Sequence, residues 1–204
     1  DRGVLAIDNK LGVIPQSRFL GEPADGPIET DTLGHQVEFQ HDFDDNWSLL
    51  LGANYRDTSL EGFATETGFS GVVDDEVNRF RRYRDYDAKY QVFRAELTGN
   101  LEIAGLEHRL IVGVDSDKFE NDQFALRDRT TEQYINVLAP VYSDANALAN
   151  DFSTQIDRVE TQESLGVFIQ DQISITDKFD VRIGARFDDY QQTLNNRSSD
   201  SRSK

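Results

Sequence analysis

The chain has 204 residues, of which 37% are hydrophobic, and its mean hydropathy of -0.60 does not favour a dense soluble core. Its 38 acidic and 21 basic residues give a net charge of -17, which argues against a nucleic-acid partner because phosphate binding relies on an excess of Lys and Arg. The chain contains no cysteine, so disulfides and cysteine-based zinc sites are excluded.

No apolar run approaches the roughly 20 residues that a membrane-spanning helix requires. A protein with this sequence that crosses a membrane therefore has to cross it as a β-barrel. The first residues, Asp1 to Val4, lack the charged and then apolar plan of a signal peptide, and the run from Asn195 to Lys204 is polar. We expect the chain to be part of a longer protein.

Apolar and polar side chains alternate from residue 33 to residue 43, with Val37 and Phe39 among the apolar ones. After three turn-type residues, 44–46, the alternation resumes from Trp47 to residue 56. A period of two residues predicts strands with one wet face, and the short connection predicts a tight hairpin.

The same pattern recurs in two further hairpins, one around the turn at residues 104–105 and one around the turn at residues 176–178. The sequence therefore predicts six long antiparallel strands in an all-β fold. They are expected near residues 32–44, 46–60, 88–103, 107–120, 160–176 and 178–193.

The lengths of these elements favour a membrane barrel over a soluble sheet. The alternating runs last about 10 to 14 residues, whereas soluble strands average about 5 to 6, and a tilted membrane strand needs roughly 9 to 11. The short turns alternate with two long segments, residues 61–89 and 119–161, which we expect to be extracellular loops. A helical tendency at residues 141–152 belongs to the second loop.

The second face of the predicted strands carries charge, which suits the polar lumen of a wide barrel. Its charged members are Arg56, Arg94, Glu96, Arg182 and Arg186. Aromatic residues lie beside the short turns, where an interfacial girdle is expected. They are Phe43, Trp47 and Phe179. Strand-end aromatics also occur in soluble sheets, so a soluble β-sandwich binding protein is an alternative.

Three stretches also resemble a known family. They are residues 15–23 with His41, Asp42, Phe43 and Trp47; residues 97–99 with His108, Leu110 and residues 112–115; and residues 170–173 with residues 184–188. In this order and spacing they resemble the early barrel of TonB-dependent outer-membrane ferric siderophore receptors, over nearly the whole chain.

The resemblance implies a receptor in the outer membrane of a Gram-negative bacterium, with a barrel of about 22 strands around a plugged lumen. It implies a ferric siderophore as transported ligand, outer-membrane lipid as surroundings and a TonB complex acting through the plug. Neither plug nor TonB box is recognisable here, so we interpret residues 1–204 as a partial barrel domain, an open curved sheet if isolated. A receptor of this family for cobalamin or a glycan is a further alternative.

The sequence offers no catalytic constellation. A phosphate-binding loop and a nucleophile elbow are lacking, and His35, His41 and His108 do not have metal-ligand spacing. A barrel enzyme, such as an outer-membrane protease or lipase, would concentrate such groups near its strand ends. We predict that the protein is not an enzyme and binds no metal or cofactor of its own.

A basic and aromatic cluster at residues 79–86 stands out in this acidic chain. Side chains alternate between the two faces of a strand, so the even-numbered residues that precede Arg94 and Glu96 should share their lumen-facing side. Four residues are then expected to face the lumen, whereas Arg81 and Tyr83 face outwards. These four candidate ligand-binding residues are Arg82, Arg84, Tyr86 and Tyr90. Arginine donors and aromatic faces suit anionic, flat metal chelates. The alternative is that the arginines only form ion pairs with nearby acidic residues. Those acids are Asp74, Asp75, Glu76, Asp85 and Asp87.

Overall fold

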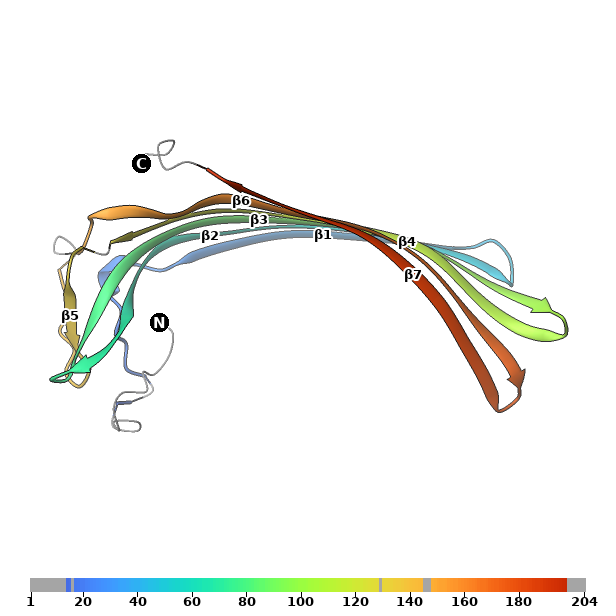
Figure 1. Ribbon diagram of the computed structural model, residues 1–204, viewed down its shortest axis with the longest axis horizontal. Coiled ribbons are helices and arrows are strands. Elements are labelled where there is room, and N and C mark those ends of the chain that lie inside the picture. The colour runs from blue at the N-terminus through green and yellow to red at the C-terminus, as the bar shows by residue number, and fades with distance from the viewer. Residues whose placement is uncertain (1–13, 16, 129, 145–147, 198–204) are drawn as a thin grey trace.

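The structure is a computed structural model that describes residues 14–15, 17–128, 130–144 and 148–197. These residues form one long, curved antiparallel sheet and a short 3-10 helix (Figure 1). The elements are η1 (Pro23–Asp25), β1 (Glu29–Asp42), β2 (Trp47–Val73), β3 (Glu76–Ile103), β4 (Leu106–Asp128), β5 (Gln133–Asn136), β6 (Phe152–Thr176) and β7 (Phe179–Asn196). The described residues contain no helix long and apolar enough to span a bilayer.

Six long strands lie side by side in the order β1-β2-β3-β4-β6-β7, and all neighbours are antiparallel. This confirms the predicted strands and their hairpin order. β1 and β7 form the two edges, so the sheet is open, as we expected for a barrel segment of this size.

The first predicted long loop, residues 61–89, is instead the far half of one hairpin. β2 continues to Val73, β3 begins at Glu76, and the turn consists of Asp74 and Asp75, both with positive φ. Asp tolerates this conformation better than most residues. The prediction was wrong here because both faces of this stretch carry polar residues, so its sequence lacks the alternation that marks a half-apolar strand.

The second long connection is shorter than predicted, because β4 reaches Asp128 and β6 starts at Phe152. Between them, β5 adds to the outer half of β3, with Val77 opposite Ile135. The predicted helix is wrong for the described residues: positions 141–144 and 148–151 have no regular structure, and Phe152 already belongs to β6. Residues 145–147 lie outside the described part.

Cross-strand register sorts the side chains onto two faces. One transverse row is entirely apolar, and its members are Phe39, Leu51, Ala95, Val114, Val167 and Phe187. The next positions along the strands belong to the other face, and that row consists of Glu38, Gly52, Arg94, Asp115, Gly166 and Asp188. We call these the apolar face and the polar face.

Within the described part of the chain, no second protein layer covers the middle of the apolar face. Val37 and Phe187 are 67% and 69% exposed, which a sheet in water would not tolerate over so many rows. The hydrophobic core lies instead at the end away from the short turns. It consists of Ile14, Leu20, Val77, Ile135 and Val137. The sheet middle is therefore built to be covered by lipid, as in membrane β-barrels.

The assignment of the faces predicts how the sheet tolerates charge. Val167→Arg places a cation on the apolar face, and we expect it to destabilise the barrel by about 2–4 kcal/mol near the bilayer midplane. The matched control Gln170→Arg lies three positions further along β6, on the polar face, and is expected to be mild. Heat-modifiability of the full-length protein in outer-membrane fractions reports the folded amount. Equal tolerance of the two variants would contradict the assigned faces.

Candidate functional site

The outer half of β3 carries the sequence-predicted ligand residues. Register is continuous from Arg94 to Arg82, so Arg82, Arg84, Tyr86 and Tyr90 share the polar face, as parity predicted. Arg81 and Tyr83 lie on the opposite face, also as predicted. The segment that the sequence suggested was a loop leading into this strand is part of the strand itself.

Arg82 and Arg84 meet at one carboxylate. Glu66 on β2 forms an ion pair with each guanidinium, at 3.3 Å from Arg82 Nε. The three side chains are 13–15% exposed, so they lie in the wall but remain in contact with solvent. Guanidinium groups bind anions through their several N–H donors, so this pair of arginines is chemically suited to contact an anionic ligand.

Phe80 and Arg127 complete this cluster. Sequence reasoning included Phe80 in the basic and aromatic stretch 79–86, although not among the four ligand candidates, and it missed Arg127. Arg127 lies directly opposite Arg82 on the neighbouring strand. The ring of Phe80 contacts both guanidinium groups, with Cζ of Arg127 at 3.6 Å and Cζ of Arg82 at 4.7 Å from its centroid. Arg127 lay in a segment predicted to be a loop, so no parity argument reached it. We call Glu66, Phe80, Arg82, Arg84 and Arg127 the outer arginine cluster.

Tyr90 lies too far away to share a small ligand with this cluster. Six residues of extended chain separate it from Arg84, which is roughly 20 Å. Its ring is 39% exposed and packs edge-on against Phe119 at 6.4 Å. Tyr86 lies between, on the same face. The four predicted residues therefore form a track along the polar face rather than one pocket.

Two arginines of the same stretch have a structural role. Arg79 is 2% exposed and donates to the carbonyl oxygens of Leu20 and Gly21, at 3.3 and 2.9 Å, and to Glu22 at 3.1 Å. On the same face, Arg81 pairs with Asp25 at 2.7 Å. Ion pairs thus involve Arg79 and Arg81 as well as Arg82 and Arg84. The partners of Arg79 and Arg81 come from the segment before β1, which sequence proximity did not suggest.

Asp128 fixes the long loop where it leaves the sheet. Its carboxylate accepts hydrogen bonds from the amides of Thr130, Thr131 and Asp151 at 2.9–3.0 Å and from the Thr131 hydroxyl at 2.8 Å. Burial opposes ionisation of this group, but the donors outweigh burial and hold the pKa of Asp128 below its ordinary value. One carboxylate therefore joins the beginning and the end of the loop.

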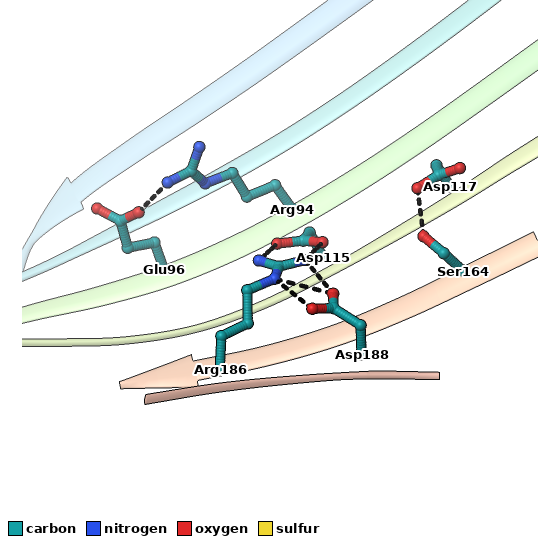
Figure 2. Close-up of polar contacts among 7 residues, drawn as sticks. All are labelled: Arg94, Glu96, Asp115, Asp117, Ser164, Arg186 and Asp188. Carbon is teal, nitrogen blue, oxygen red and sulfur yellow. Dashed lines mark hydrogen bonds and ion pairs between the residues drawn. The ribbon is translucent and has the colours of Figure 1, made fainter. Parts of the chain in front are cut away.

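A second polar network lies on the middle of the polar face (Figure 2). Arg186 makes a two-pronged contact with Asp115, both distances being 2.7 Å, and its Nε lies 2.8 Å from Asp188. Close by, Arg94 pairs with Glu96, and Ser164 bonds to Asp117 (Figure 2). Sequence parity assigned Arg94, Glu96 and Arg186 to this face correctly, although it did not predict the pairing.

Glycines keep this network flat against the sheet. A Cβ atom on Gly166 would lie 2.1 Å from Nη2 of Arg186, and one on Gly113 would lie 2.2 Å from Cζ of Phe168. Phe168 in turn lies between Arg94 and Arg186, whose Cζ atoms are 5.7 and 5.6 Å from its ring centroid. The long side chains therefore follow the wall, which leaves the space in front of it open.

The described residues offer no group of three or more metal-binding side chains. His35 and His41 lie on β1, and His108 lies on β4, where its Nδ1 is 2.8 Å from Asp171 Oδ2. The polar face presents arginine and aromatic groups that can bind a ligand, and its paired charges fix side-chain positions.

Comparison with known proteins gives consistent matches. Residues 2–204 match the family described as TonB dependent receptor-like, beta-barrel. A metal-pseudopaline receptor of Pseudomonas aeruginosa is 32% identical over 197 residues, 96% of this chain and 27% of the relative. The ferrioxamine receptor of Yersinia enterocolitica is 26% identical over 164 residues, 76% of this chain and 22% of the relative. The chain thus spans about a quarter of the length of these relatives.

Solved structures share the fold. The siderophore receptor PiuA of Acinetobacter baumannii superposes with a TM-score of 0.77 at 20% identity, covering 98% of this chain and 32% of the receptor. The ferric preacinetobactin receptor BauA of the same species gives 0.68 at 14% identity, covering 82% and 25%. At these identities the likeness concerns the fold.

The hydrogen bonds that Asp128 accepts predict that the stability of the loop between β4 and β6 depends on pH. Because the folded-state pKa of Asp128 is lowered, its stabilising effect is complete above the unfolded value of about 3.9 and is lost as the pH falls below that value through the folded pKa. Asp128→Asn cannot accept all of the hydrogen bonds that the carboxylate accepts, and we expect it to loosen the loop by about 1–3 kcal/mol. Limited proteolysis at neutral pH measures the opening.

The exposed turn residue Asp45 at the opposite end of the sheet offers the matched control, Asp45→Asn. Its cleavage pattern should equal that of the parent protein. A loop that is equally protected in the parent and in Asp128→Asn would show that other contacts hold it.

Proposed function

Because this chain belongs to the TonB-dependent receptor β-barrel family, we propose that it forms part of an outer-membrane receptor that binds a ferric siderophore at its extracellular end and imports it. The observation that carries the proposal is the outer arginine cluster, which lies on the polar face of a sheet whose opposite face is apolar. The protein is proposed to reside in the outer membrane of a Gram-negative bacterium, as a partial barrel domain over residues 1–204.

The orientation of the sheet supports an extracellular position for this cluster. Short turns connect β1 to β2, β3 to β4 and β6 to β7 at one end, whereas the hairpin tip at residues 74–75 and the loop at 129–151 lie at the other. Membrane barrels have short periplasmic turns and longer extracellular loops. The outer arginine cluster lies at the end that holds the long connection between β4 and β6, where a ligand would arrive.

The ligand chemistry follows from the side chains. Three guanidinium groups and a phenyl ring suit a chelate that carries negative charge and flat donor groups. Arg82 and Arg84 are the proposed first contacts, and Tyr86 and Tyr90 lie further along the same face. Relatives are named for metal-pseudopaline and for ferrioxamine, so metal chelates are the substrate class that we propose, with a ferric siderophore as the substrate.

The proposal includes partners that supply what this sheet does not contain. A plug domain would fill the lumen in front of the polar face, and the TonB complex would act through the plug to drive import. Lipid would cover the apolar face. No catalytic step is part of the proposed function.

Replacement of the two central arginines tests the ligand site. Arg82→Ala with Arg84→Ala removes two cationic donors, and we expect binding of an anionic chelate to weaken by about tenfold or more, since each charge-assisted hydrogen bond contributes about 1.5–3 kcal/mol. Binding would be measured on purified full-length receptor with a panel of hydroxamate, catecholate and carboxylate iron chelates.

Arg109→Ala offers the matched control, because Arg109 is an exposed arginine on the polar face near the opposite end of the sheet. It should leave chelate binding unchanged. Equal affinity in the parent and in the double variant, at equal surface expression, would remove these arginines from the site. Failure of the parent to bind any chelate in the panel would remove the proposed substrate class.

A further inference from the structure

Near the short turns, the apolar face contains an ionisable pair that the proposed function does not use. Further out on the same face, Lys118 pairs with Glu163 at 2.6 Å. Asp171 on β6 and His108 on β4 lie next to each other on this face, with His108 Nδ1 at 2.8 Å from Asp171 Oδ2. Since an ionised carboxylate only accepts hydrogen bonds, the histidine ring donates. The side chains are 12% and 30% exposed for His108 and Asp171.

The surroundings of the pair are apolar. Asp171 is opposite Leu110 on β4 and Ile183 on β7, and Ile169 and Ile173 flank it along β6. Four rows of this face run from the row that contains Phe39 to the row that contains Leu101 and His108. Among the described residues of these rows, Asp171 is the one acidic residue. An ionisable group facing lipid is costly and rare unless it is paired.

The carboxylate has acceptor capacity beyond its contact with His108. Two carboxylate oxygens provide about four acceptor sites. Oδ1 of Asp171 is buried without a hydrogen-bond partner, whereas the side chain as a whole is 30% exposed, so an outside donor approaches the carboxylate from its exposed part. The same four rows contain no Lys or Arg among the described residues. A cation that completes the pair must therefore come from outside these four rows.

The position of the pair indicates which cation can reach it. β4 begins at Leu106 and β6 ends at Thr176, so His108 and Asp171 lie near the short-turn end, with Trp47 in the same transverse row as Asp171. In the proposed orientation this is the periplasmic interface, where aromatic residues and lipid headgroups meet. Lipid headgroups are the cationic groups that this surface meets.

We propose that His108 and Asp171 form a headgroup site for phosphatidylethanolamine on the lipid-facing wall of the barrel. The primary ammonium of that headgroup donates hydrogen bonds to Asp171, and His108 orients the carboxylate. Phosphatidylcholine carries a quaternary ammonium without N–H donors, and an anionic headgroup is repelled by the carboxylate. This inference rests on the proposed location in the outer membrane.

Lipid-dependent stability tests the site, because a ligand that binds the folded state raises its stability. The full-length receptor would be placed in vesicles of dilauroyl phosphatidylcholine, alone or mixed equally with the phosphatidylethanolamine or phosphatidylglycerol of the same chains. We expect the thermal unfolding midpoint to be higher by a few degrees with phosphatidylethanolamine than in the other two. Asp171→Asn should abolish this difference, and His108→Gln should reduce it.

For each variant, the unfolding midpoint is compared between lipids. A substitution that lowers the midpoint equally in every lipid therefore does not change the measured difference. Gln170→Asn, on the polar face beside Asp171, should retain the full lipid effect. An equal midpoint of the parent protein in all three lipids, or a retained difference in Asp171→Asn, would overturn the proposal. Self-association that requires Asp171 would also overturn it, because the pair would then be a contact between barrels.

Chelate binding in the same vesicles separates this inference from the proposed function. Loss of the lipid effect in Asp171→Asn with unchanged chelate binding supports the headgroup site. A lipid effect in a parent protein that binds no chelate would overturn the proposed function and leave the headgroup site standing.

Discussion

Backbone hydrogen bonding inside a hydrocarbon layer is the constraint on which the rest of this structure depends. Lipid offers no partner to a peptide group, so each strand that crosses it must pair with its neighbours without a gap. The ladder between β2 and β3 runs unbroken from Trp47 and Gly99 to Thr67 and Arg79. The irregularities of register, at residues 67/72, 125/126 and 174/176, all lie beyond the four apolar rows, where water can satisfy the backbone.

Unbroken register also determines on which face of the sheet each side chain lies. Because side chains alternate strictly along a regular strand, the same register that gives lipid an apolar wall places Arg94, Asp115 and Arg186 on one polar wall. Because the register continues along β3 and β4, Arg82, Arg84 and Arg127 lie on the same polar face, towards the end away from the short turns. A net charge of -17 is compatible with a membrane protein because the acidic residues lie mainly on the polar wall and on the outer strand extensions.

Sequence alone predicted the parts of the fold in which one face is apolar. Alternation of apolar and polar residues, as around Phe93 and Val167, predicted the six strands and their order. The same alternation predicted that Arg82 and Arg84 lie on the polar face. The sequence-based prediction failed at residues 61–89. Both faces of the strands carry polar side chains there, so the two-residue period disappears although the strands continue. Arg127, the Glu22 to Arg79 contact and the Asp128 tether depend on pairing between residues distant in sequence, which a single sequence does not reveal.

Accessibility measured along β6 tests most directly whether this sheet is a lipid-embedded barrel wall. The chain contains no cysteine, so single spin labels can be placed at successive positions from 164 to 170 of the full-length protein in lipid vesicles. The account predicts high collision rates with oxygen at Leu165, Val167 and Ile169, and high rates with a water-soluble nickel chelate at Ser164 and Gln170. Collision rates that do not alternate with a period of two residues would contradict it.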